Sequence, residues 1–114
     1  LVGSEMCIRD RNVDRSKWDG KNQFSNDIES LIKQNLGKHN FVSNWVRTTI
    51  VGEANLMAIT CNYGGSLLSI GIRNSGTQAK ISVSARLEYG GNPSGIQITI
   101  DSVCQQLNKF MAIR

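Results

Sequence analysis

Hydrophobic residues recur at helical spacing in the stretch NDIESLIKQNLG. A helix turns once every 3.6 residues, so these positions would form one apolar stripe. The stripe consists of Ile28, Leu31, Ile32 and Leu36. Asn26 and Glu29 have the spacing of a capping box, and Gly37 is a typical helix stop. The pattern therefore predicts a helix over about residues 26–36.

Four runs with the alternating pattern of half-buried strands follow this helix. They cover about residues 43–52, 55–63, 66–73 and 78–89. The dipeptides EA, GG and SG separate consecutive runs, and GG is a strong signal for a two-residue hairpin loop. The order predicts an antiparallel meander.

Two-residue loops would also set the register of the meander. The GG loop pairs Ile59 with Ile70, and the SG loop pairs Ile70 with Ile81. The EA loop pairs Val46 with Cys61. In this register the apolar residues of all four strands share one face of the sheet. A slip of one residue would send the apolar residues of that strand to the opposite face.

The segment that follows Pro93 is compatible with two secondary structures. Residues 96, 98 and 100 are isoleucines that alternate like a strand, but the apolar residues of the whole segment keep helical spacing. Ser94 and Gln97 form a second capping box. The favoured prediction is a helix over about residues 94–112, and a strand at its start is the alternative.

These elements predict an α+β fold in the order α-β-β-β-β-α. Each helix carries one apolar stripe, so both helices are expected to pack on the apolar face of a four-stranded antiparallel sheet. At the level of fold alone, four meander strands followed by a helix resemble the single-stranded nucleic-acid-binding domains of the Whirly and Pur-alpha type. The helix-sheet-helix order also resembles profilin-type and secretion-chaperone-type domains, which implies protein binding.

The first eleven residues, LVGSEMCIRDR, show neither helical nor strand periodicity. Leu1–Asp10 can be back-translated into a transposase sequencing adaptor read in frame, with Arg11 as a hybrid codon. Residues 1–11 are therefore expected to be a non-native segment of a metagenomic assembly, with the true N-terminus missing. The polar residues 12–24 are expected to be a loose or truncated lead-in, and residues 25–114 a single α+β domain.

Charge and cysteine content narrow the function classes. The formal net charge of +4 is a mild basic excess, which suits an anionic partner. Outside the first eleven residues the cysteines are Cys61 and Cys104, and two cysteines without a leader indicate a reducing, cytoplasmic location. No apolar run is long enough to span a membrane, so no membrane partner is expected.

The sequence shows no constellation typical of catalysis or of a metal site. His39 is the only histidine and follows the helix stop, where a solvated loop is the simplest interpretation. A zinc site needs further histidines or clustered cysteines, and both thiols fall on core positions, where thiols are usually inert. The sequence therefore predicts a non-enzymatic protein with no cofactor and no metal.

The meander register predicts a second, open face rich in cations and small hydroxyl side chains. The candidate ligand-binding residues are Trp45, Arg47, Thr60, Ser69, Arg73, Lys80, Ser82 and Arg86. Arginine and hydroxyl groups donate hydrogen bonds to phosphates, and an indole can stack on a base. The predicted function is binding of an anionic ligand, either nucleic acid, with a single strand favoured, or a nucleotide.

Two alternatives remain open for this face. It could be an ordinary solvated surface, which antiparallel sheets often have. It could also be a subunit interface of a protein-interaction or homo-oligomeric module, because small residues let two sheets approach closely. Residues 43–52 and 78–89 would be edge strands, and exposed edges favour pairing between chains. A homo-oligomer is therefore expected.

Overall fold

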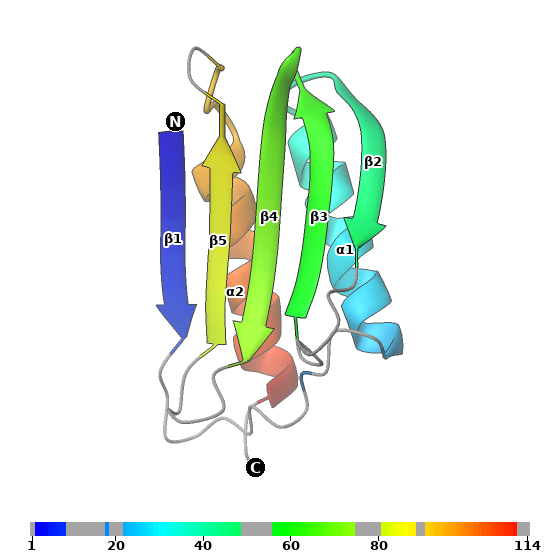
Figure 1. Cartoon of the computed structure of the whole chain (residues 1–114). Helices are drawn as coiled ribbons and strands as arrows, with labels where there is room; N and C mark the ends of the chain where they lie inside the picture. The colour runs from blue at the N-terminus through cyan, green and yellow to red at the C-terminus, as the bar shows by residue number, and fades with distance from the viewer. Residues whose placement is uncertain are drawn as a thin grey trace.

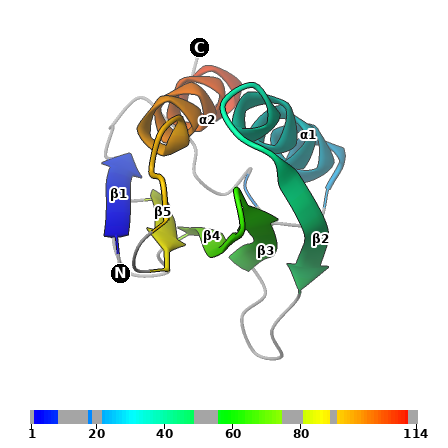
Figure 2. The ribbon, with the colours of Figure 1, turned by 90° about the horizontal axis from the view of Figure 1, so that it is seen from above.

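The computed structural model of the chain describes residues 2–8, 18, 22–48, 56–74, 81–88 and 91–111. A five-stranded antiparallel sheet and two helices on one of its faces form two layers (Figures 1 and 2). The elements are β1 (Val2–Ile8), α1 (Gln23–Gly37), β2 (Val42–Thr48), β3 (Leu56–Tyr63), β4 (Ser66–Asn74), β5 (Ile81–Leu87) and α2 (Ile96–Met111). The strand order is β1-β5-β4-β3-β2. The predicted α-β-β-β-β-α arrangement is confirmed, and β1 adds a fifth strand to it.

Helix α1 begins earlier than the sequence predicts. The side chain of Asn22 accepts a hydrogen bond from the backbone N–H of Ser25 at 2.9 Å, so Asn22 is the N-cap. The predicted capping box at Asn26 and Glu29 is therefore wrong, because the helix already begins at Gln23, and its first free N–H groups lie about one turn before Asn26. The helix starts within the stretch 12–24, which was expected to be loose.

The β3–β4 hairpin forms as predicted. Ile59 pairs with Ile70, and the turn residues Gly64 and Gly65 have φ angles of 59° and 90°. A two-residue hairpin turn of this kind needs positive φ at both positions, which glycine adopts without steric cost. A Cβ on Gly64 would also lie 2.3 Å from the side-chain nitrogen of Asn40, so this glycine has a packing role as well.

The β4–β5 register differs from the prediction by four residues. Ile70 pairs with Ala85, and Ile81 pairs with Asn74 instead of Ile70. The predicted two-residue loop is wrong, because β4 ends at Asn74 and β5 begins only at Ile81. An even shift leaves every side chain on its predicted face, so the division of these two strands into a buried and an open face is unchanged.

Strand β2 contains an irregularity that reverses its faces. The register shifts between Ser43 and Val46, and Asn44 between them has a φ of 54°. Val46 pairs with Thr60 and not with Cys61, so the predicted pairing is wrong by one residue. A bulge inserts an extra residue and so exchanges the faces of the strand beyond it. Val46 is accordingly 51% exposed.

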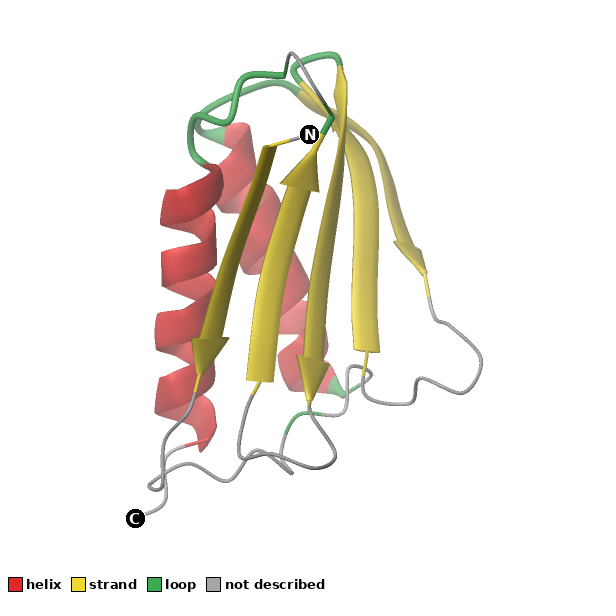
Figure 3. Ribbon diagram, turned by 60° about the vertical axis from the view of Figure 1, so that its left-hand side comes forward, coloured by secondary structure: helices red, strands yellow, loops and turns green. Residues whose placement is uncertain are grey.

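Residues at the N-terminus form the edge strand β1, which pairs antiparallel with β5 along its whole length (Figure 3). The prediction that this segment has no strand pattern is therefore wrong, and β5 is not an edge strand. Its origin in a sequencing adaptor stays a prediction. Trp18 is also 1% exposed, within the stretch expected to be a loose lead-in.

Helix α2 covers residues 96–111, which confirms the favoured helix and removes the alternative of a strand at its start. The hydroxyl of Tyr63 at the end of β3 donates a hydrogen bond to the backbone oxygen of Ser94, just before α2. The rings of Phe24 in α1 and Phe110 in α2 stack with their centroids 3.7 Å apart. The core lies between the two helices and the covered face of the sheet. None of the described helices is long and apolar enough to cross a membrane.

Candidate functional site on the open sheet face

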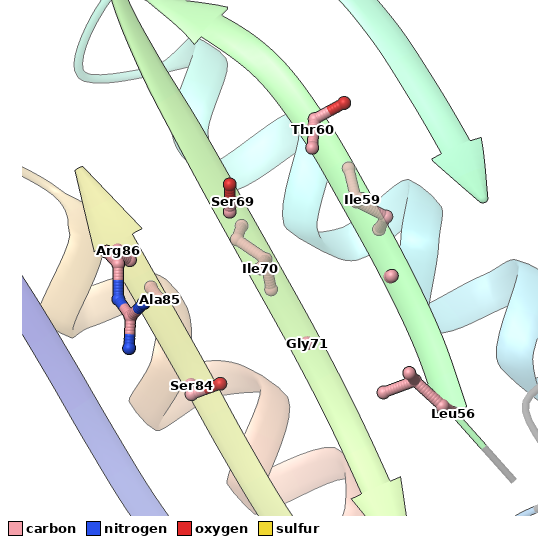
Figure 4. Close-up of a pocket in the computed structure, with 10 residues that line it drawn as sticks. Leu56, Ile59, Thr60, Ser69, Ile70, Gly71, Ser84, Ala85 and Arg86 are labelled. Atoms are coloured by element: carbon pink, nitrogen blue, oxygen red, sulfur yellow. The ribbon is translucent and has the colours of Figure 1, made fainter. Parts of the chain in front are cut away.

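A hollow of about 540 Å³ lies on the sheet face that the helices leave open (Figure 4). It spans the three strands β3, β4 and β5. Its lining residues are Leu56, Ala58, Ile59, Thr60, Ser69, Ile70, Gly71, Ser84, Ala85 and Arg86. The side chains of Ile59, Ile70 and Ala85 point to the buried face of the sheet. The hollow is therefore bordered by the side chains of the residues before and after them in each strand, which point to the open face.

Three predicted ligand-binding residues lie side by side across these strands. Thr60 pairs with Ser69, and Ser69 pairs with Arg86, so the three form one cross-strand row. Paired residues on adjacent antiparallel strands lie about 5 Å apart, which lets their side chains reach a common ligand. Arg86 is exposed, and the two hydroxyl residues are half-buried.

Two further predicted residues lie on the same face outside the hollow. Arg73 pairs with Ser82, two residues along the strands from the row that contains Gly71 and Ser84. Arg73 is exposed and Ser82 is half-buried. Lys80 falls outside the described residues. Five of the eight candidates therefore share the open face.

Trp45 and Arg47 do not belong to this face, contrary to the prediction. The indole Nε1 of Trp45 donates a hydrogen bond to Glu29 Oε2 at 2.8 Å, and Arg47 Nη1 lies 3.1 Å from Glu29 Oε1. Arg47 also donates to Asn26 at 2.6 Å. These partners belong to α1, on the covered side of the sheet. The bulge at Asn44 is the cause, since it turns the rest of β2 over.

The Trp45–Arg47 cluster has a structural role between β2 and α1. Lys33 of α1 lies 5.6 Å from the centre of the Trp45 ring, within the range of a cation–π contact. Exposed or half-exposed ion pairs contribute at most about 1 kcal/mol each. The cluster therefore holds the edge strand β2 against α1. Trp45 and Arg47 lie on the covered side of the sheet and do not border the open face.

The floor of the hollow consists of small residues that the prediction left out of the site. Ala58 pairs with Gly71, and Gly71 pairs with Ser84, in the row next to Thr60, Ser69 and Arg86. A Cβ on Gly71 would lie 3.6 Å from Ser84 Oγ and 3.9 Å from a methyl carbon of Leu56. The glycine thus leaves open the space between them. Alternation of small side chains along the strands is the sequence signal that could have identified this floor.

Other chemically capable groups lie away from the hollow. Cys61 is buried, and burial raises the pKa of its thiol to about 11, so the thiol stays protonated at neutral pH. The ring of His39 lies against Gly95 at the start of α2, where a Cβ on the glycine would be 2.4 Å from the ring. Among the described residues no group of three or more histidine, cysteine and acidic side chains is placed to hold a metal ion.

Comparison with protein-family models, with curated proteins and with solved structures finds no match to this chain.

Proposed function

We propose that this chain is a non-enzymatic binding protein whose open sheet face holds an anionic ligand of nucleotide size. The observation that carries the proposal is the hollow of about 540 Å³ bordered by the row of Thr60, Ser69 and Arg86. Ligand sites in proteins commonly enclose about 300–1,000 Å³, so the hollow has the volume for one nucleotide.

The side chains of this row suit a phosphate group. The guanidinium of Arg86 can donate two parallel hydrogen bonds to phosphate oxygens, and such charge-assisted bonds are stronger than neutral ones. The hydroxyls of Thr60 and Ser69 can donate to the remaining oxygens. Gly71 and Leu56 border the far side of the hollow and offer an uncharged surface to the rest of the ligand.

A nucleotide-sized ligand is favoured over the single-stranded nucleic acid that the sequence favoured. Binding of a single strand draws on aromatic residues that stack successive bases. Trp45, the proposed stacking residue, is hydrogen-bonded to Glu29 on the covered side, and no described residue lining the hollow is aromatic. Arg73 and Arg86 remain on the face, so a single strand stays in the test as the competing ligand.

Arg86→Ala is expected to weaken nucleotide binding about 10- to 100-fold, because hydrogen bonds to charged groups contribute about 1.5–3 kcal/mol. Isothermal titration with nucleoside mono-, di- and triphosphates at two salt concentrations measures this. Arg73→Ala is the matched control, since Arg73 shares the face but does not line the hollow. Its effect on nucleotide binding should stay below about threefold.

The same titrations distinguish a polymer from a small anion. A single-stranded oligonucleotide contacting both arginines would lose affinity with a log–log salt slope of about −0.7 for each phosphate contact. Both Arg73→Ala and Arg86→Ala would then flatten that slope. The proposal of an anionic ligand is wrong if no nucleotide or oligonucleotide binds more tightly than about 1 mM at low salt.

A second candidate function is self-association through the open face. Two apolar side chains of this face, Val46 and Leu67, are 51% and 42% exposed, and the proposed interface would cover both. We expect Val46→Lys to shift a dimer toward monomer in sedimentation equilibrium. Ile98→Lys on the outer side of α2 is the control, because Ile98 is similarly exposed at 55% but lies in the other layer. A monomer at high micromolar concentration would exclude this candidate.

A further inference from the structure

Two side chains converge on Gly71 from opposite sides of the hollow. Figure 4 shows Leu56 of β3 pointing toward the glycine from one side and Ser84 of β5 from the other. Gly71 pairs with Ser84, whereas Leu56 pairs with Arg73, two residues further along β4. Leu56 therefore reaches the glycine diagonally across the two strands. Leu56, Gly71 and Ser84 form a slot within the hollow, with the glycine as its floor.

The slot is one layer of atoms wide. A carbon at the Cβ position of Gly71 would lie 3.6 Å from Ser84 Oγ and 3.9 Å from a methyl carbon of Leu56. Both are ordinary contact distances, since nonbonded carbons attract most at about 3.5–4.0 Å. An atom in the slot consequently touches both walls, and no second layer fits beside it. A planar ring standing on its edge over Gly71 meets this limit, whereas a saturated ring carries hydrogens on both faces and is too thick.

The slot lies next to the cation of the proposed anion site. The side chain of Arg86 extends along β5 toward Ser84 (Figure 4). The two residues are two positions apart, which corresponds to about 7 Å along a strand. The methyl group of Leu56 offers an apolar contact to the face of a ring, and the hydroxyl of Ser84 can donate or accept a hydrogen bond. A phosphate at Arg86 and a ring over Gly71 can therefore belong to one small molecule.

We propose that Gly71 determines the specificity of the hollow, because it admits a planar unsaturated ring between Ser84 and Leu56. The ligand class is a phosphate monoester that carries such a ring, with its phosphate at Arg86. The ring site rests on the proposed function, since the anion must bind at Arg86 for the ring to reach the slot. Nucleotides and other aromatic phosphates share this chemistry, and the probes below distinguish the two sources.

Isothermal titration of the unaltered chain compares three phosphates, which are adenosine 5′-monophosphate, phenyl phosphate and ribose 5-phosphate. The ring-bearing ligand should bind at least about tenfold more tightly than ribose 5-phosphate, because a group that fits a pocket commonly gains a factor of ten or more. Tight binding of adenosine 5′-monophosphate supports a nucleotide. Tight binding of phenyl phosphate alone supports the slot and excludes the nucleotide as its ligand.

Gly71→Ala and Gly71→Val fill the slot in two steps. Gly71 is not among the glycines with positive φ, and a new Cβ makes only ordinary contacts, so both variants suit the backbone. Affinity for adenosine 5′-monophosphate should fall at least about fivefold in Gly71→Ala, and in Gly71→Val to that of ribose 5-phosphate. Affinity for ribose 5-phosphate should change less than about twofold in both. Arg86→Ala is the matched control, because it should weaken all three ligands alike. Circular dichroism establishes that each variant is folded.

Two results would overturn the role of Gly71 while leaving the anion site in place. In the first, ribose 5-phosphate binds the unaltered chain as tightly as the ring-bearing phosphates. In the second, both Gly71 variants keep full affinity for the ring-bearing phosphates while Arg86→Ala loses it. Failure of all three phosphates to bind more tightly than about 1 mM would overturn the proposed function and the ring site together.

Discussion

Replacing Trp18 with alanine is expected to lower the free energy of unfolding by about 3–5 kcal/mol. The side chain is 1% exposed and belongs to the central hydrophobic cluster. Its ring meets Phe24 edge-on, with the centroids 6.4 Å apart, and Phe24 in turn stacks on Phe110 of α2. Truncation leaves a cavity beside α1 that the surrounding side chains fill only in part. Urea denaturation followed by circular dichroism measures the change.

Phe41→Ala is the control for the Trp18 substitution. Phe41 is also aromatic but 75% exposed, so its truncation should change the stability by less than about 0.5 kcal/mol. Equal effects of the two substitutions would mean that Trp18 is not part of the core. The stretch that precedes α1 would then be the loose lead-in that its polar composition predicts.

Ile70→Ala is expected to cost about 2–5 kcal/mol of stability. Ile70 occupies the central strand β4, and residues of both helices surround it. Ile32 and Leu36 of α1 and Ile96 and Val103 of α2 line the same small space beside it. Removal of three side-chain carbons at this point weakens the contact of the sheet with both helices, because a close-packed core relaxes only partly around a void. The midpoint of urea unfolding reports the loss.

The neighbouring residue supplies the matched control. Ser69 pairs with Thr60 and Arg86 on the open face, and Ser69→Ala should change stability by less than about 0.5 kcal/mol. A large loss of stability for Ser69→Ala with a small loss for Ile70→Ala would mean that the buried and the open face of β4 are assigned the wrong way round. The hollow would then belong to the core, and the proposed function would fall with it.

Elements whose signals are local could be predicted from the sequence. The apolar stripe of α1 and the Gly64-Gly65 turn each lie within one short stretch of chain. Period and turn chemistry are sufficient there, because the residues that define the element are also the residues that form it. The pairing of Ile59 with Ile70 follows directly from the turn.

Pairings that cross longer loops could not be predicted in this way. The β4–β5 register depends on where the strands end, and SG suggests a two-residue loop where β4 ends at Asn74 and β5 begins at Ile81. The predicted faces of β4 and β5 remained correct, because a register shift by an even number of residues leaves each side chain on the same side of the sheet. In β2 the predicted register was wrong by one residue, because the extra residue at Asn44 has no strong signal in the sequence. A shift by an odd number of residues exchanges the two faces of the strand. Trp45 and Arg47 were consequently assigned to the wrong face.

The sequence by itself therefore determined the order of the helices, the four meander strands and the pairing of Thr60 with Ser69, whereas the position of Arg86 beside Ser69 came from the β4–β5 register of the structure. The three features that the sequence determined follow from periodicity or from an adjacent turn. Only the tertiary structure decided that Trp45 and Arg47 pair with Glu29 of α1, and that Val2–Ile8 lies beside β5. Both depend on contacts between distant parts of the chain, where one bulge or one added strand changes the neighbours of many residues without changing any local pattern.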